Sequence, residues 1–385
     1  TPKKKAPPTP SVLETTLPVP AGMSLVAPGS RRQRKKTRAN AQAMLPALEV
    51  APAPAVRSSF RRVSFSSLVA QRGRGSQPFD AADTPGHDEP AATTAAPDLE
   101  LPVPAAAARD VIDFPAGKAM GSLIHTIFER IDASHRPLRE EVQRVVNEQV
   151  TSRGQRSWKE PLVEVLCRSL ETPLGKPLGD ISLADISAAD RLLELDFSCG
   201  LPSLAEGLRA RQLGELLQAT LTTDDPLRPY ADTLASPAFD MPIGGLLTGS
   251  IDAVFRLPGS PPAAPKLLVC DYKSNKLHRS GMAAPLAAYA PEVLPAAMAE
   301  HHYPLQALLY GTALFRLLRW RLPEADPDDC VAGVLYAFIR GMQGRDTPAD
   351  EAGRRSGVFF WKPPRGLWQQ LSDLLAGASL QGAGR

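Results

Sequence analysis

Two short apolar segments joined by a turn rich in proline and glycine predict a β-hairpin in the second half of the chain. Residues 246–257 are rich in Leu, Val, Ile and Phe, and residues 266–273 are mostly apolar until their polar end. The Pro-Gly-Ser-Pro-Pro sequence at 258–262 breaks regular structure between them. Each segment carries one acid, Asp252 in the first and Asp271 in the second. The hairpin therefore places two carboxylates on neighbouring strands.

Two carboxylates at the rim of a buried sheet favour a divalent-cation site. Burying an unpaired carboxylate costs on the order of several kcal/mol, so such acids need a positive partner. Carboxylate oxygens suit Mg²⁺ or Mn²⁺, ions that keep several waters and bind substrate phosphates. Cys270 lies directly before Asp271 in the same segment.

Lys273 lies two residues after Asp271 and projects to the same face of the strand, because side chains alternate with period two. A lysine there can orient or help deprotonate an attacking water and offset negative charge on a phosphate. This is the chemistry of phosphodiester hydrolysis. An ordinary ion pair between Asp271 and Lys273 is the alternative that the two residues alone leave open.

Periodic segments around the hairpin predict an α/β fold class with a central sheet flanked by helices. From Met120 to Ile131 apolar residues recur at three- and four-residue spacing, and His125 lies just beyond the edge of this stripe. An ordinary surface histidine is the simpler interpretation of His125 taken alone. Further helices are predicted at 138–151, 158–170, 205–221 and 300–321, and further strands at 191–197 and 331–340.

The N-terminal part has a different composition. Of the 39 prolines, 16 lie in the first 110 residues, among Ala, Thr and Ser, so we expect residues 1–109 to be a flexible, disordered linker and residues 110–385 to form the folded domain. The dense cationic run from Arg31 to Arg38 either binds nucleic-acid phosphates or is a solvated tract. Residues 61–68 are interpreted as a docking strand or the start of a helix.

Several classes of protein are disfavoured. The net charge of +3 does not by itself identify a nucleic-acid-binding protein. The four cysteines form no C-x-x-C pair, so neither zinc nor an iron–sulfur cluster is expected, and no phosphate-binding G-x-x-x-x-G-K-[ST] loop predicts an ATP site. No apolar run approaches the ~20 residues of a membrane span, and we expect a cytoplasmic location. Because the chain starts at Thr1, we expect it to be a piece of a longer protein.

Five motifs resemble, in order, the nuclease domain of the RecB family within the PD-(D/E)xK superfamily. Gly-Ser-Ile-Asp at 249–252, followed by Val-Cys-Asp-Tyr-Lys-Ser-Asn at 269–275, resembles its catalytic hairpin. Residues 121–129 resemble its helix with a metal-binding histidine, and 302–310 its helix with Gln and Tyr. Residues 333–341 are similar to its closing strand, and 63–68 to the segment that precedes the domain. The aspartate at position 271 fits RecB-type domains, since the wider superfamily often has glutamate there.

The resemblance implies a restriction-endonuclease-like core with a mixed sheet and a Mg²⁺-dependent deoxyribonuclease activity of the exodeoxyribonuclease V type, with Mn²⁺ as an alternative ion. His125, Asp252 and Asp271 would bind the metal together with the backbone carbonyl of Cys270, and Lys273 would act on the attacking water. The implied partners are DNA, single-stranded or end-resected, RecC-like and RecD-like subunits, and a helicase motor. The implied setting is double-strand-break processing and recombinational repair.

The helix with Gln and Tyr supplies supporting residues in this resemblance. Gln306 and Tyr310, one helical turn apart, would contact the DNA backbone or brace the site. Tyr303 shares their face but is equally well explained by core packing, and Tyr272 points away from the metal and is interpreted as packing. Glu194, on the strand before the hairpin, is a candidate for a further carboxylate.

Two other classes of function remain open. A nuclease-like fold can serve as a non-catalytic DNA-binding or scaffolding module of a helicase–nuclease complex. A scaffold has no physical need for buried acids beside a lysine, so the set of His125, Asp252, Asp271 and Lys273 favours catalysis. A DNA-binding tail protein built around Arg31 to Arg38 would bind DNA without the folded domain.

Overall fold

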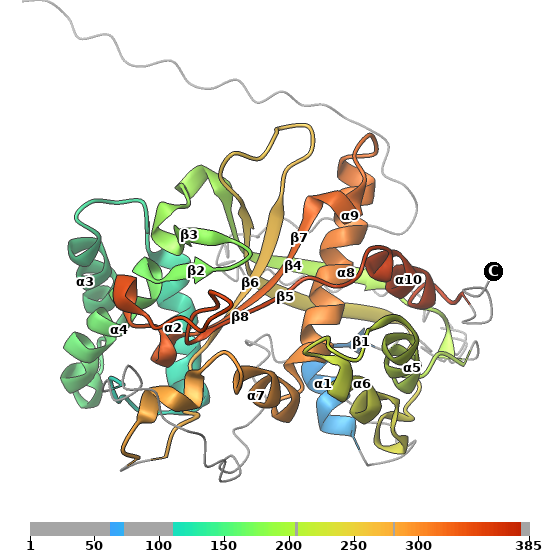
Figure 1. Cartoon of the computed structure of the whole chain (residues 1–385), viewed down its shortest axis with the longest axis horizontal. Coiled ribbons are helices and arrows are strands. Elements are labelled where there is room, and N and C mark those ends of the chain that lie inside the picture. Colours follow the sequence, from blue (N-terminus) through green and yellow to red (C-terminus); the bar gives the residue numbers. More distant parts are fainter. Residues whose placement is uncertain (1–61, 73–110, 205–206, 280–281, 379–385) are drawn as a thin grey trace, which may run out of the picture. The chain divides into compact units, whose positions relative to one another are not determined.

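The computed structural model describes residues 62–72, 111–204, 207–279 and 282–378 (Figure 1). Within them, helices cover both faces of a mixed six-stranded sheet, which confirms the predicted α/β class. The helices are α1 (Phe65–Gln71), α2 (Lys118–Arg130), α3 (Leu138–Gln149), α4 (Lys159–Glu171), α5 (Arg211–Thr220), α6 (Arg228–Ala235), α7 (Leu294–Glu300), α8 (Tyr303–Arg321), α9 (Pro327–Cys330) and α10 (Leu367–Leu374). The strands are β1 (Arg62–Val63), β2 (Pro173–Gly175), β3 (Gly179–Ser182), β4 (Arg191–Gly200), β5 (Leu246–Arg256), β6 (Leu267–Lys273), β7 (Val331–Phe338) and β8 (Val358–Trp361).

The sheet is organised around the long strand β5. β4 pairs antiparallel along one edge of β5, from its first residue to its last but one. On the other side, β6 pairs antiparallel with the last residues of β5, which confirms the predicted hairpin, and β1 pairs parallel with its first two residues. β7 then lies parallel to β6, and β8 is antiparallel to β7. β2 and β3 form a separate two-stranded hairpin.

The paired strands β5 and β6 separate at Asp252 and Asp271. Their pairing ends at Ala253 opposite Cys270, so the next residues, Asp252 and Asp271, lie where the strands separate. At that point the Tyr272 N–H donates to the Asp252 carboxylate at 2.9 Å instead of to a strand carbonyl. The separation therefore opens a polar position at the end of an otherwise apolar hairpin.

Each face of the sheet has its own apolar core. Ile251, Val269 and Tyr336 pack with α1, α5, α6, α8 and α10. Ala253 and Cys270 pack on the opposite face with α2, α3 and α4. The two groups of helices lie on opposite sides of the sheet in Figure 1. Side chains from both layers can meet where β5 and β6 separate.

Residues 62–72 form both a strand and a helix. Ser64 caps α1 by accepting the Ser67 N–H, and the Ser67 side chain accepts the Ser64 N–H in return. Phe65 and Leu68 are buried in the core beside α8. These residues fall inside the range 1–109 that we expect to be a linker, whereas the cationic run Arg31 to Arg38 lies outside the described residues.

Several elements differ from their predicted bounds: the strand predicted at 191–197 continues to Gly200, and the helix predicted at 300–321 begins at Tyr303. In two other elements the difference has a local structural cause. The helix predicted at 205–221 begins at Arg211, because Gly207 has a φ of +79° and Arg209 forms a bridge with Pro242. The strand predicted at 331–340 ends at Phe338, where the chain enters a 3₁₀ turn, Ile339–Gly341. That turn directs the side chain of Arg340 into the protein, where it is buried.

Candidate metal centre

Asp271 and Lys273 form a buried ion pair at the end of β6. The Lys273 Nζ lies 2.7 Å from Asp271 Oδ1, and the two side chains are 1% and 2% exposed. Apart from Lys273, no described residue donates a hydrogen bond to either oxygen of the Asp271 carboxylate. Breaking such a pair by removing one partner leaves an uncompensated buried charge. The structure therefore brings together the two residues that the D-x-K spacing predicts on one face.

Asp252 and His125 form a second contact at the same rim. His125 extends from α2, and its Nδ1 lies 3.1 Å from Asp252 Oδ2. His125 is only 3% exposed, although its position at the edge of the helical stripe alone fits a surface residue. The imidazole thus reaches the middle of β5, where the pairing with β6 stops, from the layer of helices that covers this face.

Glu194 completes a three-residue cluster with them. Donor atoms of His125, Glu194 and Asp252 all lie within 4.8 Å of one another. Glu194 has a φ of +48°, and the flanking residues Leu193 and Leu195 pair with residues on either side of Asp252. Its carboxylate also accepts a hydrogen bond from the Ser250 hydroxyl at 3.2 Å. The sequence alone gives Glu194 as a candidate, and the structure places it opposite Asp252.

The electrostatics of the rim show that these groups affect one another. Burial and the negative charge of Asp252 raise the pKa of Asp271 to about 7 and that of Glu194 to about 7. Burial alone lowers the pKa of His125, but the charge and hydrogen bond of Asp252 outweigh it and raise the pKa to about 9. Burial also disfavours charge on Asp252, yet the imidazolium of His125 and then Lys273 hold its pKa below the ordinary value.

This donor set fits a hard divalent cation. Three carboxylates are opposed by the ammonium of Lys273 and the imidazole of His125, and apart from Lys273 no described residue donates a hydrogen bond to Asp271. Mg²⁺ and Mn²⁺ prefer carboxylate and carbonyl oxygens, and imidazole is compatible with Mn²⁺. Cys270, whose carbonyl the resemblance assigns to the metal, immediately precedes Asp271 in β6.

Tyrosines from α8 and β7 enclose the lysine. The Lys273 Nζ lies 4.1 Å from the centroid of the Tyr303 ring and 5.6 Å from that of Tyr336. The Tyr303 hydroxyl donates to Asn275 Oδ1 at 3.0 Å. A cation held against an aromatic face without water gains about 2 kcal/mol. Tyr303 therefore lies in the core and also contacts the ammonium of Lys273.

Hydrogen bonds connect Gln306 and Tyr310 to these tyrosines. The single proton of the Tyr336 hydroxyl is shared between Gln306 Oε1 at 3.2 Å and the Tyr303 carbonyl at 3.1 Å. The Gln306 amide donates to the Tyr310 hydroxyl at 3.1 Å. Gln306 and Tyr310 are each 2% exposed, which favours bracing over direct contact with DNA. Tyr336 is a member of this network that sequence reasoning missed, because it looks like any aromatic residue in a buried strand.

Comparison with known proteins supports the resemblance to the RecB family. No protein-family model matches the chain. The chain is 39% identical over 342 residues to the RecB subunit of the RecBCD enzyme from Mycobacterium tuberculosis, an alignment that covers 84% of this chain and 29% of that protein. It is 35% identical over 335 residues to RecB of Mycolicibacterium smegmatis, covering 83% of this chain and 29% of the relative. The chain is a RecB homologue. It is also 32% identical over 271 residues to RecB of Escherichia coli, covering 70% of this chain and 20% of that protein, so it spans less than a third of these RecB subunits.

Two further residues of the RecB-like motifs lie in closely packed surroundings. Tyr272 stacks on Phe128 of α2, with ring centroids 4.0 Å apart, and its ring also lies edge-on to that of His125 at 6.4 Å. Gly249 of the RecB-like hairpin motif allows close packing, because a Cβ there would lie 2.7 Å from the Phe197 ring. None of the helices in the described ranges is long and apolar enough to cross a membrane.

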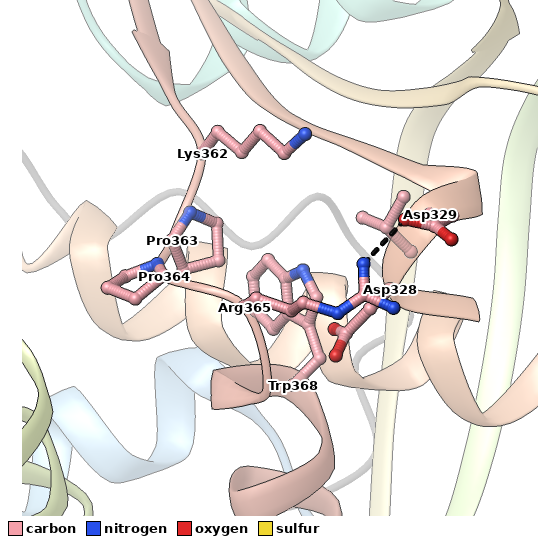
Figure 2. A pocket seen from close by; sticks show the side chains of 8 residues that line it. Asp328, Asp329, Lys362, Pro363, Pro364, Arg365 and Trp368 are labelled. Atoms are coloured by element: carbon pink, nitrogen blue, oxygen red, sulfur yellow. Dashed lines mark hydrogen bonds and ion pairs between the residues drawn. The ribbon is translucent and has the colours of Figure 1, made fainter. Parts of the chain in front are cut away.

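A pocket at the opposite end of the sheet does not belong to this site. Figure 2 shows it between the start of β7 and the residues after β8, lined by Asp328, Lys362, Arg365 and Trp368 among others. Arg365 pairs with Asp329 at 2.6 Å, and the Gly366 N–H donates to Asp328 at 2.9 Å. Arg365 and Asp328 therefore already have partners within the RecB homologue.

Proposed function

We propose that this chain is a Mg²⁺-dependent deoxyribonuclease domain of the RecB type that hydrolyses phosphodiester bonds. The observation that carries the proposal is the buried Asp271–Lys273 pair beside a cluster of His125, Glu194 and Asp252. Catalytic sites keep buried charges close together although doing so costs stability. A module that only binds or guides DNA gains nothing from this arrangement.

Different residues of the centre would have different roles in hydrolysis. His125, Asp252, Asp271 and the Cys270 carbonyl would hold the cation, with Glu194 as a further carboxylate. A bound Mg²⁺ would polarise the scissile phosphate and neutralise charge developing on it. The Lys273 ammonium, paired with Asp271 at 2.7 Å, would orient the attacking water and donate to the phosphate.

The surrounding residues keep this arrangement fixed. Asp252 is oriented by the Tyr272 N–H at 2.9 Å. Tyr303 limits the movement of the ammonium of Lys273 from the α8 side. Gln306 joins that helix to β7 through Tyr336 and is itself bonded to Tyr310 within the helix. Groups held in place before the substrate arrives need not reorganise during the reaction, which is a large source of rate enhancement.

The setting of the activity follows from the names of the relatives. They are RecB subunits of RecBCD enzymes, so we propose that the domain acts in double-strand-break processing and recombinational repair, in the cytoplasm. RecC-like and RecD-like subunits and a helicase motor would deliver single-stranded or end-resected DNA to it. The second candidate, a non-catalytic module of such a complex, predicts DNA binding without cutting.

Cleavage of end-labelled single-stranded and double-stranded DNA tests the proposal. With Mg²⁺ the wild-type chain should cut, and EDTA or Asp271→Ala should abolish the cutting. Circular dichroism shows whether the variant is folded. Metal-independent cutting, or a folded Asp271→Ala variant as active as wild type, would overturn the proposal. Binding without cleavage, both alone and after reconstitution with a helicase motor, would favour the non-catalytic module.

A further inference from the structure

Arg340 is a fully buried arginine that contacts the residue directly after Lys273 of the proposed centre. It lies in the turn after β7, and its side chain is 0% exposed. Arginine is rarely buried without partners, because removing its charge from water costs on the order of several kcal/mol. The groups that offset this cost therefore indicate what the residue does.

The guanidinium joins two segments that are distant in sequence. Its Nε donates to the Ser274 carbonyl at 2.8 Å, and its Nη2 donates to the Pro115 carbonyl at 3.0 Å. Its Cζ lies 3.5 Å from the centroid of the Phe114 ring, which is cation–π geometry. Asp113 adds a weaker contact at 3.5 Å and also pairs with Lys276 at 2.8 Å.

Both segments carry residues of the candidate centre. Ser274 directly follows Lys273, and Asp271 lies three residues before it in the chain. Residues 113–115 lead into α2, which begins at Lys118 and carries His125. The guanidinium thus connects the end of the strand that holds the Asp271–Lys273 pair with the start of the helix that holds the imidazole.

We propose that Arg340 is a positioning residue that sets the separation between His125 and the Asp271–Lys273 pair, and through it the affinity of the centre for a divalent cation. The inference rests on the proposed metal-dependent function. A planar guanidinium can donate to two carbonyls in different directions while its face packs on Phe114, and the ammonium of lysine cannot. Arg340→Lys therefore keeps the charge but loses the geometry.

Arg316 provides a matched control. It too joins distant segments, donating to the Ser372 carbonyl at 2.6 Å and to the Gly200 carbonyl at 3.3 Å. These contacts link α8 to α10 and to the end of β4, away from the acids of the centre. Arg316→Ala should cost stability without changing the spacing of the candidate ligands.

Mn²⁺ binding to the whole chain, followed by electron paramagnetic resonance, gives a readout separate from catalysis. We expect Arg340→Lys and Arg340→Ala to bind Mn²⁺ about tenfold or more weakly, as is typical when the support of a metal ligand is lost. Arg316→Ala should stay within about twofold of wild type under the same conditions. Phe114→Leu keeps the guanidinium and should therefore lose less Mn²⁺ affinity. This variant keeps the inference testable if Arg340→Ala does not fold.

The outcomes separate this inference from the proposed function. Excess Mn²⁺ should restore DNA cleavage by folded Arg340→Lys toward the wild-type rate, because only occupancy of the centre is impaired. Unchanged Mn²⁺ affinity in folded Arg340→Lys and Phe114→Leu would show that Arg340 is merely structural and overturn the inference. Wild-type protein that binds Mn²⁺ but cuts no DNA would contradict the proposed function and leave the Arg340 comparison valid. Wild-type protein that binds no Mn²⁺ would overturn both.

Discussion

Glu194 adopts a left-handed backbone conformation opposite Asp252, and the two carboxylates lie within 4.8 Å of each other and of the His125 ring. A residue other than glycine pays roughly 1–2 kcal/mol for this conformation. Strain of this kind persists where the surrounding structure requires it, often at functional sites. Here the irregularity lies in β4, between the residues that pair on either side of Asp252.

Replacing Glu194 should separate its backbone cost from its chemical role. Without metal, the free energy of unfolding of Glu194→Gly should be about 1 kcal/mol higher than that of Glu194→Ala, because glycine tolerates the positive φ. Both variants should bind Mn²⁺ more weakly than wild type, since both lack the carboxylate. Chemical denaturation and Mn²⁺ titration measure the two effects. Equal stability of the two variants would contradict the strain argument, and unchanged Mn²⁺ affinity would remove Glu194 from the proposed ligands.

Cation binding should release protons and strengthen as the pH rises from 6 to 9. The pKa of Asp271 and that of Glu194 are raised to about 7, chiefly by burial, and the charge of Asp252 raises the pKa of His125 to about 9 against the effect of burial. Ligands must lose their protons to bind a metal, so protons and the cation compete. Calorimetric titration in buffers of different ionisation enthalpy counts the protons released. An enthalpy independent of the buffer would contradict this expectation.

The metal-free chain should lose stability as the pH rises toward 9. The pKa of His125 is raised to about 9 in the folded state, above its ordinary value of 6.5. A raised pKa means that the folded state binds the proton more tightly, so the contribution is present below pH 6.5 and is lost as the pH passes through 9. Thermal unfolding at several pH values measures this slope. His125→Asn should flatten it, and an unchanged slope in that variant would assign the effect to other groups.

The aromatic ring over Lys273 should matter more than its hydroxyl. Tyr303→Phe keeps a ring 4.1 Å from the ammonium and removes the hydroxyl that donates to Asn275. Tyr303→Leu also loses the cation–π contact, worth about 2 kcal/mol where water is excluded, so cleavage should fall about tenfold or more below that of the Phe variant. Single-turnover cleavage rates of the two variants give the comparison. Equal rates would show that the ring only fills space.

Much of the site could be predicted from the sequence because its chemistry is local. Asp252, Asp271 and Lys273 lie on one hairpin, whose strands are marked by their apolar residues and whose turn is marked by proline and glycine. The relation of His125 to Asp252 is different, since it depends on how α2 packs across the sheet. That packing is determined by the whole apolar core and not by spacing within one segment.

Other features could not be predicted from sequence patterns because they depend on irregular backbone or distant contacts. The orientation of Glu194 depends on a single positive φ in β4. Arg340 looks like the polar end of a strand in the sequence, yet the 3₁₀ turn after Phe338 buries it against residues more than 200 positions earlier. The place of β1 beside β5 is equally non-local.

The most direct test of the central claim is single-turnover DNA cleavage by Lys273→Ala, measured beside wild type together with DNA affinity in the absence of metal. Cleavage should fall by at least about a hundredfold, since general acid–base assistance typically contributes ~10²–10⁴-fold. DNA affinity should change little, because Lys273 is 1% exposed and pairs with Asp271 in the free protein. Cleavage at the wild-type rate by a folded Lys273→Ala variant would contradict the claim that the Asp271–Lys273 pair is the chemical centre of this domain.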